Sequence, residues 1–152
     1  MVVEDHERVP PVLERRLGYL LKRALADLDA LVGEALRPLG LTWRLLAVLI
    51  LLEHEGPMPQ NVLGRRARAD RTSTVALVDT LEELGFVQRR VSSHDRRAYE
   101  ISLTQAGRAV IRRGLQYYDQ VEREVLAVLE PAEREVLGDL LLAVVLGRKP
   151  DR

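Results

Sequence analysis

The stretch Asp70-Arg71-Thr72-Ser73-Thr74-Val75-Ala76-Leu77-Val78-Asp79-Thr80-Leu81-Glu82-Glu83-Leu84-Gly85 decides how the rest of the sequence is interpreted. Asp70 is a residue type preferred at helix N-caps, and Gly85 is the residue type that most often ends a helix. Between them, apolar side chains recur at three- and four-residue steps, at Leu77, Val78, Leu81 and Leu84. This spacing predicts a helix with one apolar and one polar face.

The segments on either side of this helix complete a compact unit. A short helix is expected just before it, from Pro59 to about Arg66. After it come two β-favouring stretches, Phe86 to Val91 and Tyr99 to Leu103, which are separated by the polar turn 92–97. Two short helices in tandem followed by a β-hairpin predict a winged helix-turn-helix.

Longer helices are expected outside this unit. Apolar positions at helical spacing run from Pro11 to Leu36, and Pro38-Leu39-Gly40 stops that pattern. Thr42 is expected to cap a second, buried helix that ends at Gly56-Pro57. Thr104 is expected to cap a further long helix running to about Leu129, and Pro131 to begin a final one to Leu146.

The predicted fold class is therefore mainly α with a small β-hairpin, a winged helix-turn-helix flanked by long terminal helices. The closing stretch 140–146 is apolar on every side, and a monomer of 152 residues offers too little surface to cover it. We expect a subunit interface there, with an internal helix of a monomer as the alternative. The predicted division is 1–40 for an N-terminal dimerisation helix, 41–104 for the winged unit and 105–152 for the C-terminal dimerisation helices.

Charge is balanced overall but unevenly distributed. The chain has 23 basic and 23 acidic residues, so composition alone does not indicate nucleic acid. Basic residues are nevertheless in excess between 59 and 104, where they form two clusters, Arg65, Arg66, Arg68 and Arg71, and then Arg89, Arg90, Arg96 and Arg97. Such local clusters can bind phosphate despite a neutral total.

Residues 41–107 resemble the MarR family of transcription regulators. The resemblance is carried by Asp70-Arg71, Leu77-Val78-Asp79, Leu81-Glu82, Leu84-Gly85-Phe86-Val87, Asp95-Arg96-Arg97 and Ile101-Ser102-Leu103-Thr104 with Gly107. It implies a homodimer whose terminal helices interlock and which binds a palindromic operator in double-stranded DNA, as a repressor. The second helix of the pair would enter the major groove, and the hairpin would reach the minor groove.

Residues expected to contact DNA follow from these positions. Arg97 matches the family's wing arginine, and Asp95 would hold it or a neighbour by an ion pair. Gln60, Asn61, Arg65 and Arg68 would meet phosphate. The remaining expected contacts are Arg71, Thr72, Ser73, Val75, Ala76, Arg90 and Arg96.

The second helix departs from its family at 71–76. The family's usual Arg-Ser-Thr-Val-Thr-Arg is here Arg71-Thr72-Ser73-Thr74-Val75-Ala76, so two outward polar positions are apolar. Valine and alanine can only touch a thymine methyl, which favours an A·T-leaning site read largely through DNA shape.

A small aromatic or phenolic effector is a further implication of the resemblance. The aromatic residues that could line its crevice are Tyr19, Trp43, Tyr117 and Tyr118. A tryptophan at the head of a buried helix is more often part of the core, so this alternative stays open for Trp43.

Other functions are not expected. Ser93-His94-Asp95 are neighbours on a turn and cannot align as a catalytic triad, so no enzyme activity is expected. The scattered histidines and the absence of cysteine indicate no metal site and no disulfide, and no cofactor motif is present. Without a signal peptide or a membrane-spanning stretch, we expect a cytoplasmic protein.

Two alternatives to a repressor remain. A sequence-tolerant architectural DNA binder is favoured by the apolar second helix and disfavoured by zero net charge. An interaction module that kept this fold and lost DNA binding is the other, because fold does not determine function.

Overall fold

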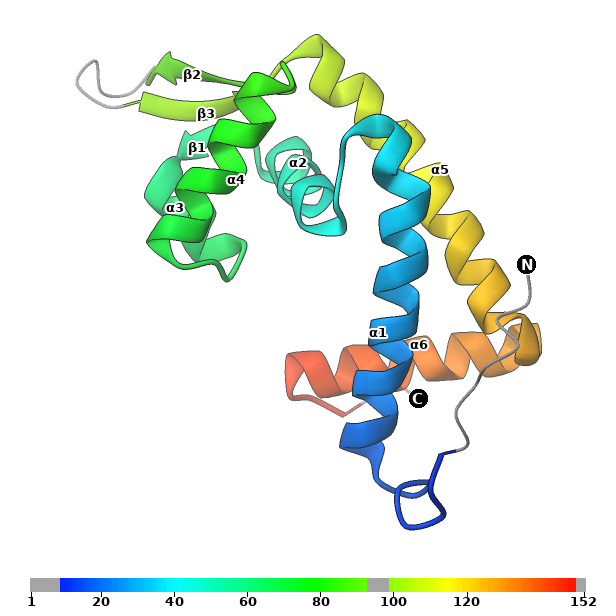
Figure 1. Cartoon of the computed structure of the whole chain (residues 1–152). Coiled ribbons are helices and arrows are strands. Elements are labelled where there is room, and N and C mark those ends of the chain that lie inside the picture. The colour runs from blue at the N-terminus through cyan, green and yellow to red at the C-terminus, as the bar shows by residue number, and fades with distance from the viewer. Residues whose placement is uncertain (1–8, 93–98, 150–152) are drawn as a thin grey trace.

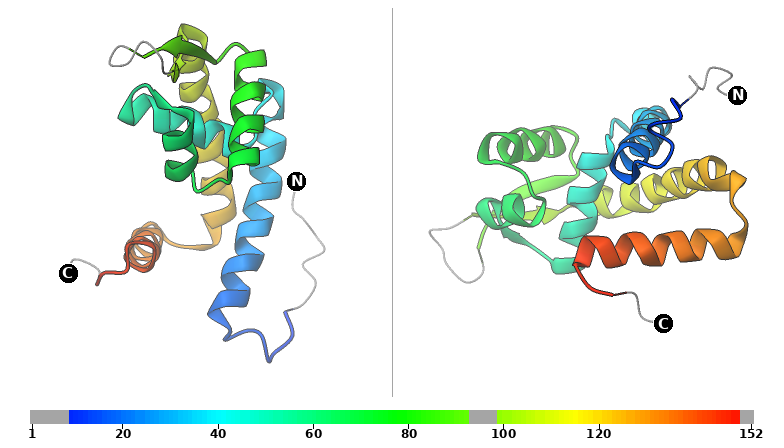
Figure 2. Two further views of the ribbon diagram at one scale, coloured as in Figure 1. Left: turned by 90° about the vertical axis from the view of Figure 1, so that its left-hand side faces the viewer. Right: turned by 90° about the horizontal axis from the view of Figure 1, so that it is seen from below.

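The computed structural model describes residues 9–92 and 99–149. In this part of the chain a compact lobe of helices and a small sheet sits at one end of two long helices, α1 and α5, which run side by side (Figure 1). Helix α6 follows the far end of α5 and extends away from the pair (Figure 2). The predicted fold class is confirmed: a winged helix-turn-helix with long helices before and after it.

Helix α1 (Leu17–Leu36) begins six residues later than the sequence pattern predicts. Residues 11–15 form turns instead, and Arg16 is extended (φ −93°, ψ 90°). Val12 and Leu17 are 71% and 75% exposed, so packing within the subunit does not support an earlier first turn. The end is as predicted, with a short 3₁₀ helix, η1 (Arg37–Leu39), leading into Gly40.

Helix α2 (Trp43–Glu55) is the centre of the core, as predicted. The Thr42 hydroxyl accepts the Leu45 amide at 3.3 Å and caps the helix. Five of its side chains are buried: Leu45, Leu46, Val48, Leu49 and Leu52. They pack with apolar residues of α1, α4, α5 and the sheet, so this helix joins the lobe to the long helices.

The tandem helices are α3 (Gln60–Arg66) and α4 (Arg71–Glu83). Asp70 caps α4 as predicted, since its carboxylate accepts the Ser73 amide at 2.8 Å. Val78 and Leu81 face the core and are fully buried. Gly85 follows with φ 73°, a conformation that a residue with a Cβ rarely adopts, and turns the chain into the hairpin.

The predicted hairpin is present, and a third strand joins it. Strands β2 (Val87–Val91) and β3 (Tyr99–Leu103) pair antiparallel, with Val87 opposite Leu103 and Val91 opposite Tyr99. The added strand β1 (Met58–Pro59) pairs with β3, giving the order β1-β3-β2. Two residues that include a proline carry no alternating pattern, so the sequence offered no signal for β1.

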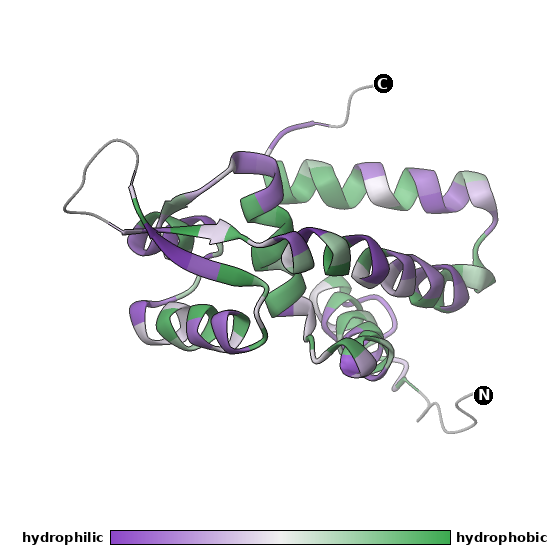
Figure 3. Cartoon of the chain, turned by 90° about the horizontal axis from the view of Figure 1, so that it is seen from above, coloured by the Kyte–Doolittle hydropathy of each residue, from purple (hydrophilic) through white to green (hydrophobic). Residues whose placement is uncertain are grey.

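Helix α5 (Gln105–Val125) connects the lobe to the C-terminal part. Thr104 caps it as predicted, accepting the Gly107 amide at 3.0 Å. The helix ends at Val125 rather than near Leu129, because η2 (Leu126–Val128) tightens the chain into a turn. Pro131 then starts α6 (Pro131–Leu146), which runs apart from the lobe (Figure 2) and is largely apolar along its second half (Figure 3).

Candidate nucleic-acid interface

Helices α3 and α4 approach each other closely at one point. A Cβ at Gly64 would lie 2.5 Å from the Thr74 Oγ1, so only glycine permits this contact. The buried Thr74 hydroxyl donates to the Asp70 carbonyl at 2.7 Å, which fixes its side chain against α3. The crossing of the two helices is thereby set by small side chains.

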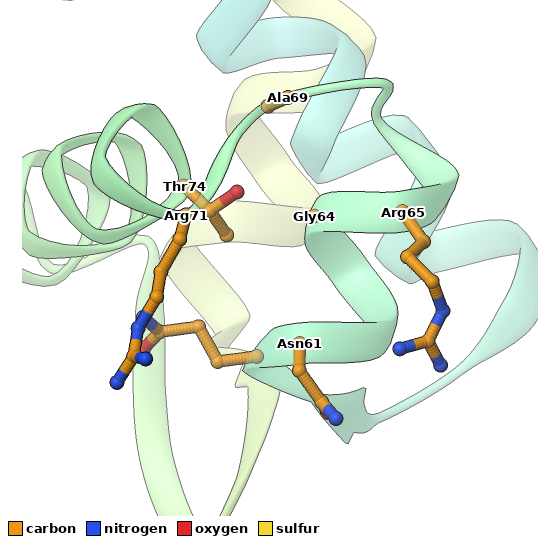
Figure 4. A pocket seen from close by; sticks show the side chains of 7 residues that line it. Asn61, Gly64, Arg65, Ala69, Arg71 and Thr74 are labelled. Carbon is orange, nitrogen blue, oxygen red and sulfur yellow. The ribbon is translucent and has the colours of Figure 1, made fainter.

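A hollow of about 550 Å³ opens between these helices. It is lined by Gln60, Asn61, Gly64, Arg65, Ala69, Arg71 and Thr74. The side chains of Asn61, Arg65 and Arg71 extend to the same side of the helix pair (Figure 4). Residues predicted to contact DNA from two helices are therefore brought together on one surface.

The outward face of α4 carries the other predicted contacts. Thr72, Val75 and Ala76 are exposed. Ser73 is only half-buried and its hydroxyl donates to the Asp70 carboxylate at 2.8 Å, so this side chain serves the helix cap. The two amide and hydroxyl bonds from Ser73 hold the pKa of Asp70 below its ordinary value.

Arg89 does not belong to a phosphate-binding cluster, contrary to the sequence prediction. From β2 its guanidinium reaches α4, where it pairs with Asp79 and Glu82, and its backbone amide donates to Glu82 at 3.1 Å. The guanidinium of Arg89 also donates to the side-chain amide oxygen of Gln60 at 3.5 Å. The hydrogen bond to Asp79 raises the pKa of Arg89 above its ordinary value.

Sequence reasoning missed this role. The only available signal was the pair of acids three residues apart on α4, and nothing in the sequence shows that β2 folds back over them. The cluster of arginines in the helix pair is also reduced, because Arg66 is paired with Glu55 at 2.9 Å.

The remaining predicted basic contacts differ in their surroundings. Arg68 is exposed in the turn between α3 and α4 with φ 50°, an uncommon conformation for a residue other than glycine. Arg90 is exposed on β2. When the side-chain amide of Gln88 is flipped, its oxygen accepts a hydrogen bond from the Nη2 of Arg90 at 2.8 Å. Asp95, Arg96 and Arg97 lie outside the described residues, as do the Ser93 and His94 of the excluded triad.

Two of the four predicted effector residues, Trp43 and Tyr118, are in contact. The ring of Trp43 packs against Tyr118, with centroids 4.4 Å apart and planes tilted by 32°. Burial raises the pKa of the Tyr118 hydroxyl. Trp43 also lines a hollow of about 330 Å³ with residues of α2, the end of α3 and the turn after it, and α4, but Tyr19, Tyr117 and Tyr118 are not among its lining residues.

That hollow contains three arginines that the sequence prediction did not place near Trp43. Arg44, Arg66 and Arg68 line it together with the apolar Ala47, Val48, Leu51, Ala67 and Leu77. An aromatic ring beside several guanidinium groups is suited to a flat anion.

Residues 9–92 and 99–149 contain no group of three or more histidine or acidic side chains placed to hold a metal ion. In the same ranges no single helix is long and apolar enough to cross a membrane. Leu17–Leu39 and Trp43–Glu55 reach that threshold only as a pair, and they are bent by 71°.

A capped second helix with an exposed outer face, a sheet beside it and arginines gathered on one side define a DNA-binding protein of the winged helix-turn-helix class. Residues 41–99 match the sequence model of the MarR family. An HTH-type transcriptional repressor of Mycobacterium tuberculosis is 34% identical over 120 residues, which are 78% of this chain and 86% of the relative. The chain belongs to the MarR family of transcription regulators.

Solved structures agree with this assignment. A probable transcriptional regulator from Pseudomonas aeruginosa is 34% identical, with a TM-score of 0.78 over 87% of this chain and 98% of that one. The repressor CouR, bound to a 23-mer DNA duplex, is 28% identical with a TM-score of 0.82, covering 91% of this chain and 99% of that one. CouR from Rhodococcus jostii has also been solved with p-coumaroyl-CoA, at 27% identity, a TM-score of 0.75 and coverages of 89% and 95%.

Proposed function

We propose that this chain is a homodimeric repressor that binds a palindromic operator through α4 and the wing. The observation that carries the proposal is the shared surface of Asn61, Arg65 and Arg71 beside the exposed face of α4. In this division of labour residues 41–104 bind DNA, while 1–40 and 105–152 join the subunits. The solved complex of CouR with DNA supports it by analogy.

Each DNA contact has a different task. Gln60, Asn61, Arg65 and Arg68 neutralise or bind phosphate and so fix the position of α4. Arg71 lies with Asn61 and Arg65 on the phosphate side, while Thr72, Val75 and Ala76 face the base edges and Ser73 acts through the helix cap. Arg90 and, from the sequence resemblance, Asp95, Arg96 and Arg97 form the wing contact with the minor groove.

Unpartnered apolar surface supports the homodimer. On α6, Leu140, Val144 and Val145 are 50%, 75% and 68% exposed. Helix α1 adds Leu21 and Leu25, which are 47% and 55% exposed. Monomeric proteins rarely leave such contiguous apolar helices open to water, and a second copy with the same two helices would cover them.

An aromatic acid is the proposed effector, held beside Trp43. Arg44 and Arg68 would bind its carboxylate, while Val48, Leu51 and Leu77 contact its ring. Arg68 also lies in the turn between α3 and α4. A ligand bound in the hollow would therefore change how these two DNA-binding helices are arranged. Trp43 is the only tryptophan, and quenching of its fluorescence by salicylate or hydroxycinnamates tests this site.

A selection from random duplexes tests the DNA-binding proposal. The full-length protein is mixed with randomised duplexes, and bound sequences are amplified and read. An enriched palindrome supports the repressor. A broad A·T preference supports the architectural alternative, which the apolar face of α4 favours, and no enrichment supports an interaction module that has lost DNA binding.

Effector control is measured on the selected operator. Operator affinity is titrated with and without the aromatic acid, and linkage requires equal changes in both binding equilibria, typically ~1 to 3 kcal/mol. Replacing Trp43 with Phe removes the fluorescence signal but keeps an aromatic ring. If this variant still responds to the acid in the operator titration, the site does not require the tryptophan itself. Unchanged affinity across a panel of aromatic acids contradicts effector control.

A further inference from the structure

The hydrogen-bonding groups of α4 are largely used within the protein. The hydroxyls of Ser73, Thr74 and Thr80 donate to Asp70, to the Asp70 carbonyl and to the Ala76 carbonyl, at 2.8, 2.7 and 2.8 Å. The carboxylate of Asp79 is held by Arg89. Among the described side chains of α4 from 71 to 80, this leaves Arg71 and Thr72 as the polar groups for which the structure gives no internal hydrogen bond.

Arg71 is placed for the DNA backbone. Its side chain lines the hollow between α3 and α4 and extends to the same side as Asn61 and Arg65 (Figure 4). A group of two guanidinium ions and an amide is suited to phosphate oxygens. Arg71 is therefore assigned to positioning rather than to a guanine edge.

Between Thr72 and Thr80, the exposed side chains of α4 are apolar. Val75 is 37% exposed, and Ala76 beside it is exposed as well. The Thr72 methyl, one turn before Ala76, lies on the same face of the helix. Base pairs differ in the major groove by their donors and acceptors and by one apolar group, the thymine 5-methyl.

We propose that α4 selects its operator chiefly by contact of Val75 and Ala76 with thymine 5-methyl groups, rather than by hydrogen bonds to base edges. The inference rests on the proposed function, because it takes α4 to lie in the major groove. It narrows the ligand to duplexes with thymine at fixed positions in each half-site. The same surface would accept the identically placed methyl of 5-methylcytosine.

The test uses the selected operator with thymine replaced by uracil, which removes the methyl and keeps base pairing. Burial of one methyl or methylene is worth ~0.8 kcal/mol, so each contacted methyl contributes about a four-fold change in affinity. For one contact in each half-site we expect about a fifteen-fold weaker complex. A parallel operator with 7-deazaguanine for guanine, which lacks the N7 acceptor, should bind within about two-fold of the original.

A double-mutant cycle joins the side chain to the methyl. Val75→Ala should weaken binding to the thymine operator and leave the uracil operator within about two-fold, because the partner methyl is already absent. Val128→Ala is the matched control: the same change at a residue that is 87% exposed in η2, away from α4. At a contacted position, 5-methylcytosine should bind more tightly than cytosine.

The outcomes separate this inference from the proposed function. No enriched operator overturns both. An operator that binds equally well with uracil, and weakens with 7-deazaguanine, overturns the methyl contact alone and assigns specificity to Arg71 or the wing. Equal losses for Val75→Ala on thymine and uracil operators likewise overturn it, because the side chain would then act only through folding.

Discussion

Arg89 shows how one side chain joins three elements of the DNA-binding lobe. From β2 it reaches Asp79 and Glu82 on α4 and Gln60 at the start of α3. Without it, two carboxylates would stand unpaired near the surface proposed for DNA. The guanidinium thus orients the wing against α4 and cancels negative charge at the same time.

Replacing Arg89 with Ala should weaken operator binding by about 1 to 2 kcal/mol, since charged hydrogen bonds of this kind are lost and the carboxylates repel phosphate. Fluorescence anisotropy with a labelled operator measures the change. The operator affinity of Arg89→Lys should lie between those of wild type and Arg89→Ala, because an ammonium keeps the charge but not the planar fork.

The charge part of this role is tested by rescue. Adding Asp79→Asn and Glu82→Gln to Arg89→Ala should restore much of the DNA affinity if repulsion causes the loss. Arg112→Ala, at an exposed position on α5, is the matched removal of an arginine and should have little effect. Wild-type affinity in Arg89→Ala would contradict the assignment.

Asp70 predicts a pH-dependent contribution to stability. Its folded pKa is lowered by the amide and hydroxyl of Ser73, so the cap stabilises the fold above the unfolded-state pKa of ~3.9. That contribution is lost as the pH falls through the folded pKa. The urea midpoints of wild type and Asp70→Ala should therefore converge below about pH 4.

Asp70→Asn provides the control, because asparagine caps helices without titrating. Its difference from Asp70→Ala should stay constant over the same pH range. If the difference in urea midpoint between wild type and Asp70→Ala does not shrink at low pH, the charge of Asp70 is not what stabilises the fold.

Residues whose role depends on neighbours in the chain could be predicted from sequence. Asp70 and Thr104 cap their helices through contacts three residues away, so the local pattern contains the information. Arg89 could not, since its partners Asp79 and Glu82 come close only after β2 folds over α4. Its charge alone placed it wrongly among phosphate contacts.

At the level of elements, close helix packing depends on glycine. Gly64 faces Thr74 between α3 and α4, and Gly114 of α5 faces Leu46 of α2, where a Cβ would come within 2.8 Å of the leucine Cδ1. These contacts set the angle of α4 within the lobe and the seat of α2 on α5.

Gly64→Ala should destabilise the protein by ~1 to 3 kcal/mol, because the Cβ forces Thr74 and α4 away. Chemical denaturation in urea measures the loss. Gly33→Ala is the control: it lies inside α1 with nothing within 4 Å of its added Cβ, and should be neutral or stabilising by up to ~1 kcal/mol. A Gly64→Ala protein as stable as wild type would show that the crossing of α3 and α4 is loose.

Element prediction failed where local signals were weak or packing was needed. Strand β1 is two residues long and was missed, since it exists only through its pairing with Ile101 and Glu100. The early start predicted for α1 was wrong because Val12 and Leu17 find no packing partner within the subunit. Strong caps and long apolar patterns were sufficient to predict helices such as α2 and α4 from the sequence.

For the whole molecule, the proposed subunit interface predicts a strong effect of charge on α6. Replacing Leu141 and Val145 together with Glu places two carboxylates in the interface, where an unpaired buried charge costs several kcal/mol. Light scattering should show monomeric or aggregated protein, and operator binding should be lost.

Ala132→Glu adds one carboxylate in the exposed first turn of the same helix, where an acid favours the helix. This variant should remain dimeric and bind DNA as wild type does. A soluble, stable dimer in the Leu141 and Val145 variant would move the interface away from α6.

Helix α5 makes the lobe and the far end of the subunit mechanically continuous. Thr104 bonds to Gly85 and Phe86 at 2.7 and 3.0 Å, so the first turn of α5 is tied to the hairpin it follows. Its 21 residues form a lever about 30 Å long. A rotation of ten degrees at the α6 end would swing the lobe by roughly 5 Å, more than the 3.4 Å step between base pairs. If α6 joins the subunits, small movements at that interface would set the distance between the two DNA-binding lobes and so the spacing of half-sites that the dimer can bind.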